Sequence, residues 1–366
     1  MTVSPLTAHR SLLIMAGGTG GHIFPGLAIG EAMQARGWEV SWLGTAHGME
    51  NELVPAQGIP MDTLEFSGLR GKGLGHTLRG ALALVRSYFR SRGILTRRNP
   101  DLVLGMGGYV TVPGGLAAAR QGRPLVLVNA DAAPLLSNQF LGRFAAKVLF
   151  GFAGDFGSLA HKAVATGNPV RRAICELPPP KARYGKRAGP LRILAVGGSL
   201  GARALNEALP AALNLMAPEV RPWVTHQTGR ANLESVRTAY ANFGVKAEIL
   251  PFIEDMPARL AEADLVICRA GAITVSELTA AGVASLLIPL VVSTTSHQRD
   301  NAEYMAREGA AMHLPQGSLT PERLAQVLLT VDREEACKFA EAAYRLGRRD
   351  AARDVADILE GLVKKS

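Results

Sequence analysis

Cysteines and metal-binding motifs are scarce in this sequence. Its 366 residues include three cysteines, Cys175, Cys268 and Cys337, which are widely spaced and form no C-x-x-C pair. This usage argues against a disulfide framework and against a zinc site, and it favours a reducing compartment. No D-x-D pair occurs either. We therefore expect no essential metal in the chemistry, and no cofactor.

Long hydrophobic runs are also absent. The longest apolar stretch, residues 284–292, is short and interrupted by Pro289, so the sequence predicts no membrane-spanning helix. Residues 1–10 lack the charged-then-apolar order of a signal peptide. An apolar content of 48% with 19% charged residues is typical of a well-packed soluble protein, and 366 residues are enough for two α/β domains.

Acidic residues are fewer than basic ones. The formal net charge of +9 favours anionic partners, which include nucleotides, nucleic acids and acidic membrane surfaces. Aromatic residues make up only 5% of the chain, and no nucleic-acid motif or aromatic stacking platform accompanies the positive charge. Nucleic-acid binding is therefore disfavoured.

Strand-like apolar runs alternate with helical patterns along most of the chain, which is typical of parallel sheets covered by helices. Both halves open in the same way, with a strand at 12–16 or 191–196, a glycine-rich loop, and a helix over 23–33 or from about 204. This repeat predicts an α/β fold of two Rossmann-like domains with parallel sheets facing a cleft. The other expected strands are 39–43, 102–104, 125–129, 147–150, 221–226, 247–250, 265–268 and 284–288.

A proline-rich, basic interval, residues 176–190, predicts a linker between the halves. We expect an N-terminal domain over residues 1–170 and a C-terminal domain over 171–344. The tail from 335 to 363 has an amphipathic helical pattern, and its last part, 345–366, is expected to pack back onto the N-terminal domain.

The first glycine-rich loop lies between a strand and a helix, where backbone N–H groups can approach an anion. It contains Gly17-Gly18-Thr19-Gly20-Gly21 and ends at His22, which can transfer a proton near neutral pH. Ile23 stands where a dinucleotide fingerprint has its third glycine, and the next strand ends without a ribose-binding acid. A nicotinamide dehydrogenase is therefore disfavoured. A loop used only for tight packing, with His22 as a structural residue, is the alternative.

Two further glycine loops follow strands, one with Gly105, Gly107, Gly108 and Tyr109 and one starting Gly197-Gly198-Ser199. Three such loops favour phosphate or sugar recognition. Tyr109 either lines a substrate site or packs on a neighbouring loop.

Candidate ligand contacts in the second half each have a structural alternative. Residues 272–274 open a helix and can offer N–H groups to a diphosphate. Glu277 either binds ribose hydroxyls or completes a capping box with Thr274, given the T-x-x-E spacing. Gln298 either binds sugar hydroxyls or is an ordinary loop residue. Arg171 either reaches a phosphate or is a surface cation.

The segment 68–98 is basic and amphipathic. Its apolar stripe is Leu74, Leu78, Leu82, Val85 and Phe89, and no acidic residue interrupts its arginines and lysine. Such a helix either lies on an anionic bilayer surface or covers its own sheet with its arginines in solvent.

Taken in order, these motifs resemble those of the MurG family of bacterial glycosyltransferases, from about Leu12 to the end of the chain. The markers are 17–25, 105–109, 167–171, 197–199, 251–253 and 269–277. The resemblance implies a glycosyltransferase B fold and an inverting enzyme that transfers N-acetylglucosamine (GlcNAc) from UDP-GlcNAc. The acceptor would be the 4-hydroxyl of the muramyl sugar (MurNAc) in lipid I, and the product lipid II. It also implies a peripheral protein on an anionic phospholipid surface, the cytoplasmic face of the inner membrane, with other cell-wall synthesis proteins as possible partners.

The resemblance also implies roles for individual residues. His22 would be the base, or would orient the acceptor. Residues that would line the donor and acceptor cleft or bind the donor are Thr19, Gly20, Gly21, Tyr109, Arg171, Ser199, Asn206, Ile253, Ala272, Ile273, Thr274, Glu277 and Gln298. Among them, Arg171 and Ser199 would contact phosphates, Ile253 uracil, Glu277 the ribose and Gln298 GlcNAc.

Two departures from the family pattern affect these roles. Val128-Asn129-Ala130-Asp131 stands where the family usually has His-Glu-Gln-Asn, and Leu200 stands where a glutamine is common. Asp131 is an alternative base. Two other functions compete with glycosyl transfer: a sugar-nucleotide epimerase of similar build, and a nucleotide-binding scaffold at the membrane.

Overall fold

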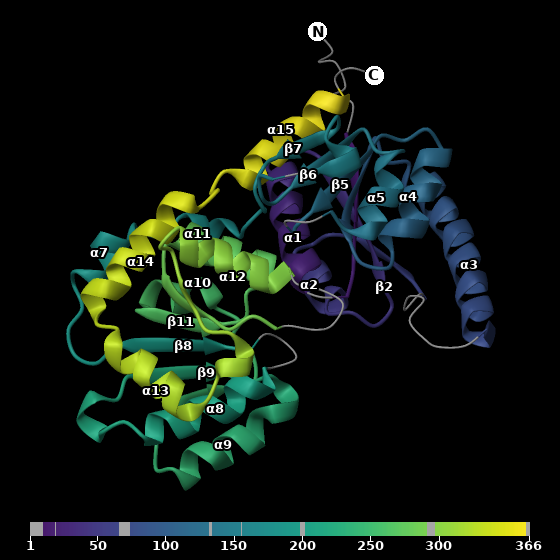
Figure 1. The fold of residues 1–366 in the computed structure, drawn as a ribbon. Coiled ribbons are helices and arrows are strands. Elements are labelled where there is room, and N and C mark those ends of the chain that lie inside the picture. Colours follow the sequence, from purple (N-terminus) through teal and green to yellow (C-terminus); the bar gives the residue numbers. More distant parts are fainter. Residues whose placement is uncertain are drawn as a thin grey trace. The chain divides into compact units, whose positions relative to one another are not determined.

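The computed structural model describes residues 10–18, 20–65, 74–131, 134–154, 156–197, 202–290 and 297–363, with the backbone alone for 74–79. The chain divides into two compact units. The first unit combines Met1–Arg171 with Asp350–Ser366, and the second is Arg172–Arg349. Each unit contains one parallel sheet with helices packed on it (Figure 1).

The described residues of the first unit form a seven-stranded sheet in the order β3-β2-β1-β4-β5-β6-β7. Its central strands, β1 and β4, are buried almost throughout because helices cover both faces. The strands are β1 (Ser11–Ala16), β2 (Glu39–Thr45), β3 (Met61–Leu64), β4 (Leu102–Gly107), β5 (Leu125–Asn129), β6 (Lys147–Phe150) and β7 (Ala163–Ala165).

Two hydrophobic clusters lie on opposite faces of this sheet. One contains side chains of α1 and α15, and the other contains side chains of α3, α4 and α5. The C-terminal helix α15 therefore belongs to the first unit, where Arg36 after α1 forms ion pairs with Asp357 (2.7 Å) and Glu360 (3.0 Å). The helices are α1 (Gly20–Gln34), α2 (Glu50–Ala56), α3 (Leu74–Arg98), α4 (Thr111–Arg120), α5 (Leu136–Gly142) and α15 (Ala351–Val363).

The described residues of the second unit form a six-stranded sheet in the order β10-β9-β8-β11-β12-β13. Its strands are β8 (Arg192–Val196), β9 (Trp223–Gln227), β10 (Glu248–Leu250), β11 (Leu265–Cys268), β12 (Ala284–Leu287) and β13 (Met312–His313). Its helices are α6 (Arg172–Cys175), α7 (Pro180–Tyr184), α8 (Arg203–Asn214), α9 (Leu233–Asn242), α10 (Met256–Glu262), α11 (Ala272–Ala281), α12 (His297–Arg307), α13 (Pro321–Thr330) and α14 (Arg333–Leu346).

The predicted α/β class and the two parallel sheets are confirmed. Every strand expected from the sequence is present within a few residues, but β3, β7 and β13 were not expected. All three are edge strands of two to four residues. A short edge strand is covered on fewer sides, so it lacks the continuous apolar run that identified the central strands.

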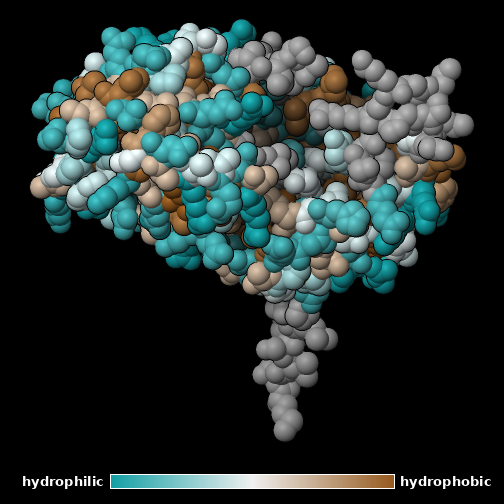
Figure 2. Space-filling model, turned by 90° about the horizontal axis from the view of Figure 1, so that it is seen from below, coloured by the Kyte–Doolittle hydropathy of each residue, from teal (hydrophilic) through white to brown (hydrophobic). Residues whose placement is uncertain are grey.

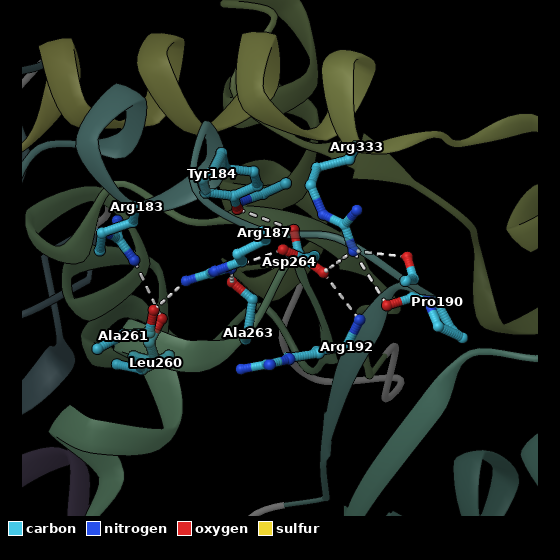
Figure 3. Close-up of polar contacts among 12 residues, drawn as sticks. Arg183, Tyr184, Arg187, Pro190, Arg192, Leu260, Ala261, Ala263, Asp264 and Arg333 are labelled. Carbon is cyan, nitrogen blue, oxygen red and sulfur yellow. Dashed lines mark hydrogen bonds and ion pairs between the residues drawn. The ribbon is translucent and has the colours of Figure 1, made fainter.

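The prediction of a linker over residues 176–190 is wrong, because this segment is packed into the second unit. Tyr184 in α7 is 2% exposed, and its hydroxyl donates a hydrogen bond to the Asp264 carbonyl at 2.8 Å. The buried Asp264 carboxylate binds Arg187 at 2.6 Å and Arg333 at 3.1 Å (Figure 3). Prolines and basic residues therefore serve here to fix the segment against α14 and the strand β11.

Surface hydropathy is mixed on the face drawn in Figure 2, where hydrophobic residues are interspersed with hydrophilic ones. Within the described ranges, no helix has both the length and the apolar content that a membrane crossing requires.

Candidate functional site

The predicted glycine loops follow the central strands of each sheet. The first sheet reverses its strand order between β1 and β4, and the second reverses it between β8 and β11. Ligands of open α/β sheets bind at the carboxyl ends of strands at such switch points. The loop after β1 leads into α1, whose first turn carries His22. The loop after β4 holds Tyr109, and the loop after β11 leads into α11. In both units, the loops singled out from the sequence therefore follow the strands that flank the switch point.

In the first unit the two glycine loops pack directly on each other. A Cβ atom built on Gly107 would lie 2.7 Å from Nδ1 and Cε1 of His22, and one built on Gly108 would lie 2.4 Å from the Gly17 carbonyl oxygen. Both glycines also have positive φ angles, 113° and 82°. Only glycine fits at these positions, because any side chain would displace His22 or the first loop.

His22 lies in the first turn of α1, which begins at Gly20 rather than at the expected residue 23. The residue is half-buried, and its enclosed Nδ1 atom has no hydrogen-bond partner among the described residues. Burial lowers the pKa of His22 below 6.5, and the Asp131 carboxylate and the Met106 carbonyl oppose that shift without cancelling it. The imidazole is therefore mostly neutral at pH 7, the form that can accept a proton.

Asp131 is thus an electrostatic neighbour of His22, on the loop that follows β5. This loop is held by Asn129, which is fully buried. Asn129 Nδ2 donates to the Asp131 carbonyl at 2.6 Å, and its Oδ1 accepts from the Leu135 N–H at 2.8 Å. Residues 128–131 depart from the family pattern, and two of them have a visible effect here. The Asn129 amide holds the loop, and the Asp131 carboxylate is near His22.

Arg171 lies close to the start of α1. Its guanidinium stacks 4.8 Å from the centre of the Phe24 ring. Phe24 in turn packs on Gly20, where an added Cβ would lie 2.9 Å from the ring. Tyr109 is 40% exposed, and Thr19 lies outside the described residues. Gly20, Gly21, His22, Tyr109 and Arg171 therefore lie on neighbouring elements of the first unit.

In the second unit, α11 begins directly after the loop of β11. Its N-cap is Gly271, which has no side chain to cap the first turn, and the N–H groups of Ala272, Ile273 and Thr274 precede the first intrahelical bond. This is the geometry of an anion-binding helix start. The capping-box alternative for Glu277 is wrong, because Thr274 is inside the helix and is not its N-cap.

Two residues of α12 fix the loops around this helix start. Asn301 is 2% exposed and donates to the Ala270 carbonyl at 3.0 Å. Gln298 Oε1 accepts from the Leu290 N–H at 2.9 Å. The predicted sugar contact Gln298 is therefore a partly buried residue that ties the start of α12 to the chain after β12.

Asn206 is a buried residue of α8. It is 5% exposed, its Nδ2 donates to the Thr228 carbonyl at 3.1 Å, and its Oδ1 lies 3.1 Å from Nε2 of His226. These contacts fix Asn206 inside the second unit, between the end of β9 and the residue that follows it. Ile253 is also buried, at 5% exposed. Ser199 and Leu200 lie outside the described residues.

Sequence reasoning missed Asn301 and the buried carboxylate Glu50. Both act on loops that are distant in sequence, and neither stands in a recognisable motif. Within the described ranges, no three His, Cys, Asp or Glu side chains are grouped as metal ligands.

Comparison with known families decides the classification. Residues 12–150 match the glycosyltransferase family 28 N-terminal domain, and residues 192–357 match the family 28 C-terminal domain. The chain belongs to glycosyltransferase family 28. A relative from Janthinobacterium sp. (strain Marseille) is 63% identical over 97% of this chain and 99% of its own length. Its name is UDP-N-acetylglucosamine--N-acetylmuramyl-(pentapeptide) pyrophosphoryl-undecaprenol N-acetylglucosamine transferase.

Solved structures agree with the family 28 assignment. Acinetobacter baumannii MurG superimposes with a TM-score of 0.79 at 37% identity, covering 96% of this chain and 99% of that one. A putative UDP-N-acetylglucosamine 2-epimerase from Listeria monocytogenes has a TM-score of 0.67 at 17% identity, covering 98% of each chain. The second likeness shows a shared fold alone. The predicted glycosyltransferase B fold is confirmed.

Proposed function

We propose that this family 28 enzyme transfers GlcNAc from UDP-GlcNAc to the 4-hydroxyl of MurNAc in lipid I, with inversion, and so forms lipid II. The observation that carries this proposal is the full-length similarity to transferases of that name, at 63% identity for the Janthinobacterium relative. The loops of both units that the switch points select support it. We assign acceptor binding to the first unit and donor binding to the second.

The reaction is a single displacement at the anomeric carbon. The acceptor oxygen forms a bond to that carbon while the bond to the diphosphate oxygen of UDP breaks, and the acceptor proton passes to a base. His22 is the base in this proposal, because its lowered pKa keeps the imidazole neutral at pH 7. The Asp131 carboxylate, its electrostatic neighbour, stabilises the imidazolium that forms.

Negative charge builds up on the departing diphosphate and must be stabilised. The uncapped start of α11 supplies N–H groups and the positive end of a helix dipole, and Arg171 and Ser199 supply further phosphate contacts in this proposal. Glu277 holds the ribose, Ile253 contacts uracil, and Gln298 contacts GlcNAc. Charge compensation by these groups requires no metal ion, so EDTA is expected to leave the rate unchanged.

Peripheral docking on anionic phospholipid would bring the enzyme to its lipid acceptor at the cytoplasmic face of the membrane. On α3, Leu82, Val85 and Phe89 are 63%, 52% and 60% exposed, so these members of the stripe do not cover the sheet. The core-facing side of α3 carries other residues, including Leu84 and Tyr88. Exposed apolar side chains among arginines are the surface that an anionic bilayer binds.

A second exposed apolar group lies on α5 and on the residues directly after it. Helix α5 is a neighbour of α4, which packs against α3 (Figure 1). Leu136 is 82% exposed, and Phe140 and Phe144 are 41% and 48% exposed. The guanidinium of Arg143 stacks over both aromatic rings, at 5.0 and 6.0 Å. We include this group in the proposed docking surface.

Incubation with and without acceptor tests the proposed reaction against its two rivals. With UDP-GlcNAc alone, an epimerase would convert the sugar nucleotide, whereas we expect it to remain unchanged over the time of the assay. With UDP-GlcNAc and a lipid I analogue, we expect release of UDP in proportion to disaccharide formed. Tight donor binding without turnover on that acceptor would instead identify a binding scaffold, and would refute the proposal.

A further inference from the structure

A fully enclosed carboxylate lies beside the first glycine loop. Glu50, the first residue of α2, is 0% exposed. Its Oε1 accepts hydrogen bonds from the backbone N–H of Thr45 at 2.8 Å and from the Thr45 hydroxyl at 2.6 Å, and its Oε2 accepts one from the Gly18 N–H at 3.4 Å. An enclosed ionised carboxylate is costly unless such donors are already in place.

The surrounding backbone is shaped to this side chain. A Cβ atom on Gly17 would lie 2.7 Å from Oε1 of Glu50, and one on Gly44 would lie 2.9 Å from its Cγ. A Cβ on Gly48 would overlap the carboxylate itself. Gly17 after β1, Gly44 in β2 and Gly48 after β2 thus leave the space that Glu50 fills. The end of β2 is joined to the loop after β1 through this one side chain.

The hydrogen bond between Glu50 and Gly18 matters because Gly18 lies close in sequence to the start of α1 and to His22. Gly18 has a φ of 98° and lies two residues before α1, whose first turn carries His22. On its other side, the same loop packs through the Gly17 carbonyl against Gly108, while His22 packs on Gly107. The loop is therefore held between Glu50, which accepts a hydrogen bond from the Gly18 N–H, and the second glycine loop.

We infer that Glu50 is a positioning residue for glycosyl transfer. Its carboxylate fixes the backbone at Gly18 and thereby sets the start of α1 and the place of His22 relative to the acceptor. This inference rests on the proposed function of the first unit as the acceptor-binding unit. A residue that served only to fill space would work equally well as the neutral amide of the same size.

Glu50→Gln tests this directly, because it keeps the volume and removes the charge. The glutamine oxygen can still serve Thr45, but its NH₂ group then faces the Gly18 N–H, donor against donor. We expect kcat/KM for a lipid I analogue to fall about 10- to 100-fold, the range for losing a hydrogen bond to a charged group. The dissociation constant of UDP-GlcNAc, measured by calorimetry, should stay within about twofold. Hydrogen exchange in a peptide covering 15–24 should become faster.

Glu52→Gln is the matched control, since Glu52 is an exposed residue of the same helix, and it should match the wild type in every measurement. Unchanged kcat/KM in Glu50→Gln would overturn the inference, and so would a loss of donor affinity equal to the loss in kcat/KM.

If Glu50→Gln does not fold, Thr45→Val provides a second test. It removes one of the three hydrogen-bond donors to Glu50 and should give the same pattern with smaller changes. If the wild type forms no disaccharide, the proposed function fails, and unchanged exchange of the 15–24 peptide in Glu50→Gln would then still overturn the role of Glu50.

Discussion

At the scale of single residues, the proposed chemistry depends most on His22. The sequence singled it out because it ends the first glycine loop and titrates near neutral pH. The structure adds two facts that the sequence does not contain: the imidazole packs on Gly107, and burial lowers its pKa despite the nearby Asp131. A neutral histidine at this position can accept the acceptor proton without first losing one.

Replacing His22 tests that role. We expect His22→Ala to reduce kcat by about 10²- to 10⁴-fold, the usual range for general base catalysis, and to leave UDP-GlcNAc affinity unchanged. Wild-type kcat/KM should fall with acid at a pH below 6.5, because protonation of the base abolishes its function and its pKa is lowered. Asp131→Asn serves as the comparison for the alternative base. Full activity in His22→Ala, or a larger loss in Asp131→Asn, would assign the base elsewhere.

His226 makes a separate prediction about stability. It is fully buried between Tyr240 and Asn206, and burial lowers its pKa from 6.5 to about 4. The unfolded chain therefore binds more protons than the folded one between these pH values, so acid destabilises the fold. This residue alone should lower the free energy of unfolding by about 2 kcal/mol between pH 7 and pH 5.

Urea denaturation at both pH values measures this difference. The pH dependence should become weaker by that amount in His226→Gln, whatever its stability at pH 7, and should be unaffected in His161→Gln, which alters an exposed histidine. An equal pH dependence in His226→Gln and the wild type would contradict the assignment.

At the scale of helices and strands, the observed start of α11 shows that Thr274 and Glu277 do not form a capping box. Thr274 and Glu277 have the spacing of a capping box, but α11 begins at Ala272 after Gly271. Sequence spacing alone cannot locate a helix start to within two residues, so it could not distinguish a cap from a residue inside the helix. With capping excluded, Glu277 remains the candidate for the ribose.

Glu277→Gln tests that role in the donor site. Loss of a charged acceptor for a ribose hydroxyl should weaken UDP-GlcNAc binding by about 10- to 100-fold in calorimetry. Glu303→Gln, on the exposed side of α12, is the matched control and should bind like the wild type. Donor affinity that stays at the wild-type value in Glu277→Gln would remove Glu277 from the site.

The exposed stripe of α3 makes the membrane proposal testable. Replacing Leu82, Val85 and Phe89 together by serine should reduce co-sedimentation with phosphatidylglycerol-containing liposomes at least about tenfold, because the apolar contribution to binding is lost. The activity on a short-chain, soluble acceptor should remain. Leu329→Ser, which changes an exposed leucine of α13, should bind liposomes normally. Undiminished liposome binding by the triple variant would exclude this face.

At the scale of the whole molecule, the repeated order of strand, glycine loop and helix was enough to predict two parallel α/β sheets and the loops at their switch points. Local patterns of this kind can be recognised because they involve residues that are consecutive in the sequence. The short edge strands and the packed segment around Tyr184 were not predictable, because their structure depends on partners far along the chain. Asn206 and Glu50 show the same limit within the site: what each amide or carboxylate binds is decided by long-range contacts.

Analysis of the product linkage is the sharpest test of the proposed reaction, transfer of GlcNAc to one hydroxyl with inversion. The purified product of UDP-GlcNAc and a lipid I analogue should be examined by NMR for the linkage position and the anomeric configuration. We predict a β-linkage to the 4-hydroxyl of MurNAc, since displacement at the α-anomeric carbon of the donor inverts it. A retained α-configuration, a linkage to another hydroxyl, or no glycosylated product would contradict the account.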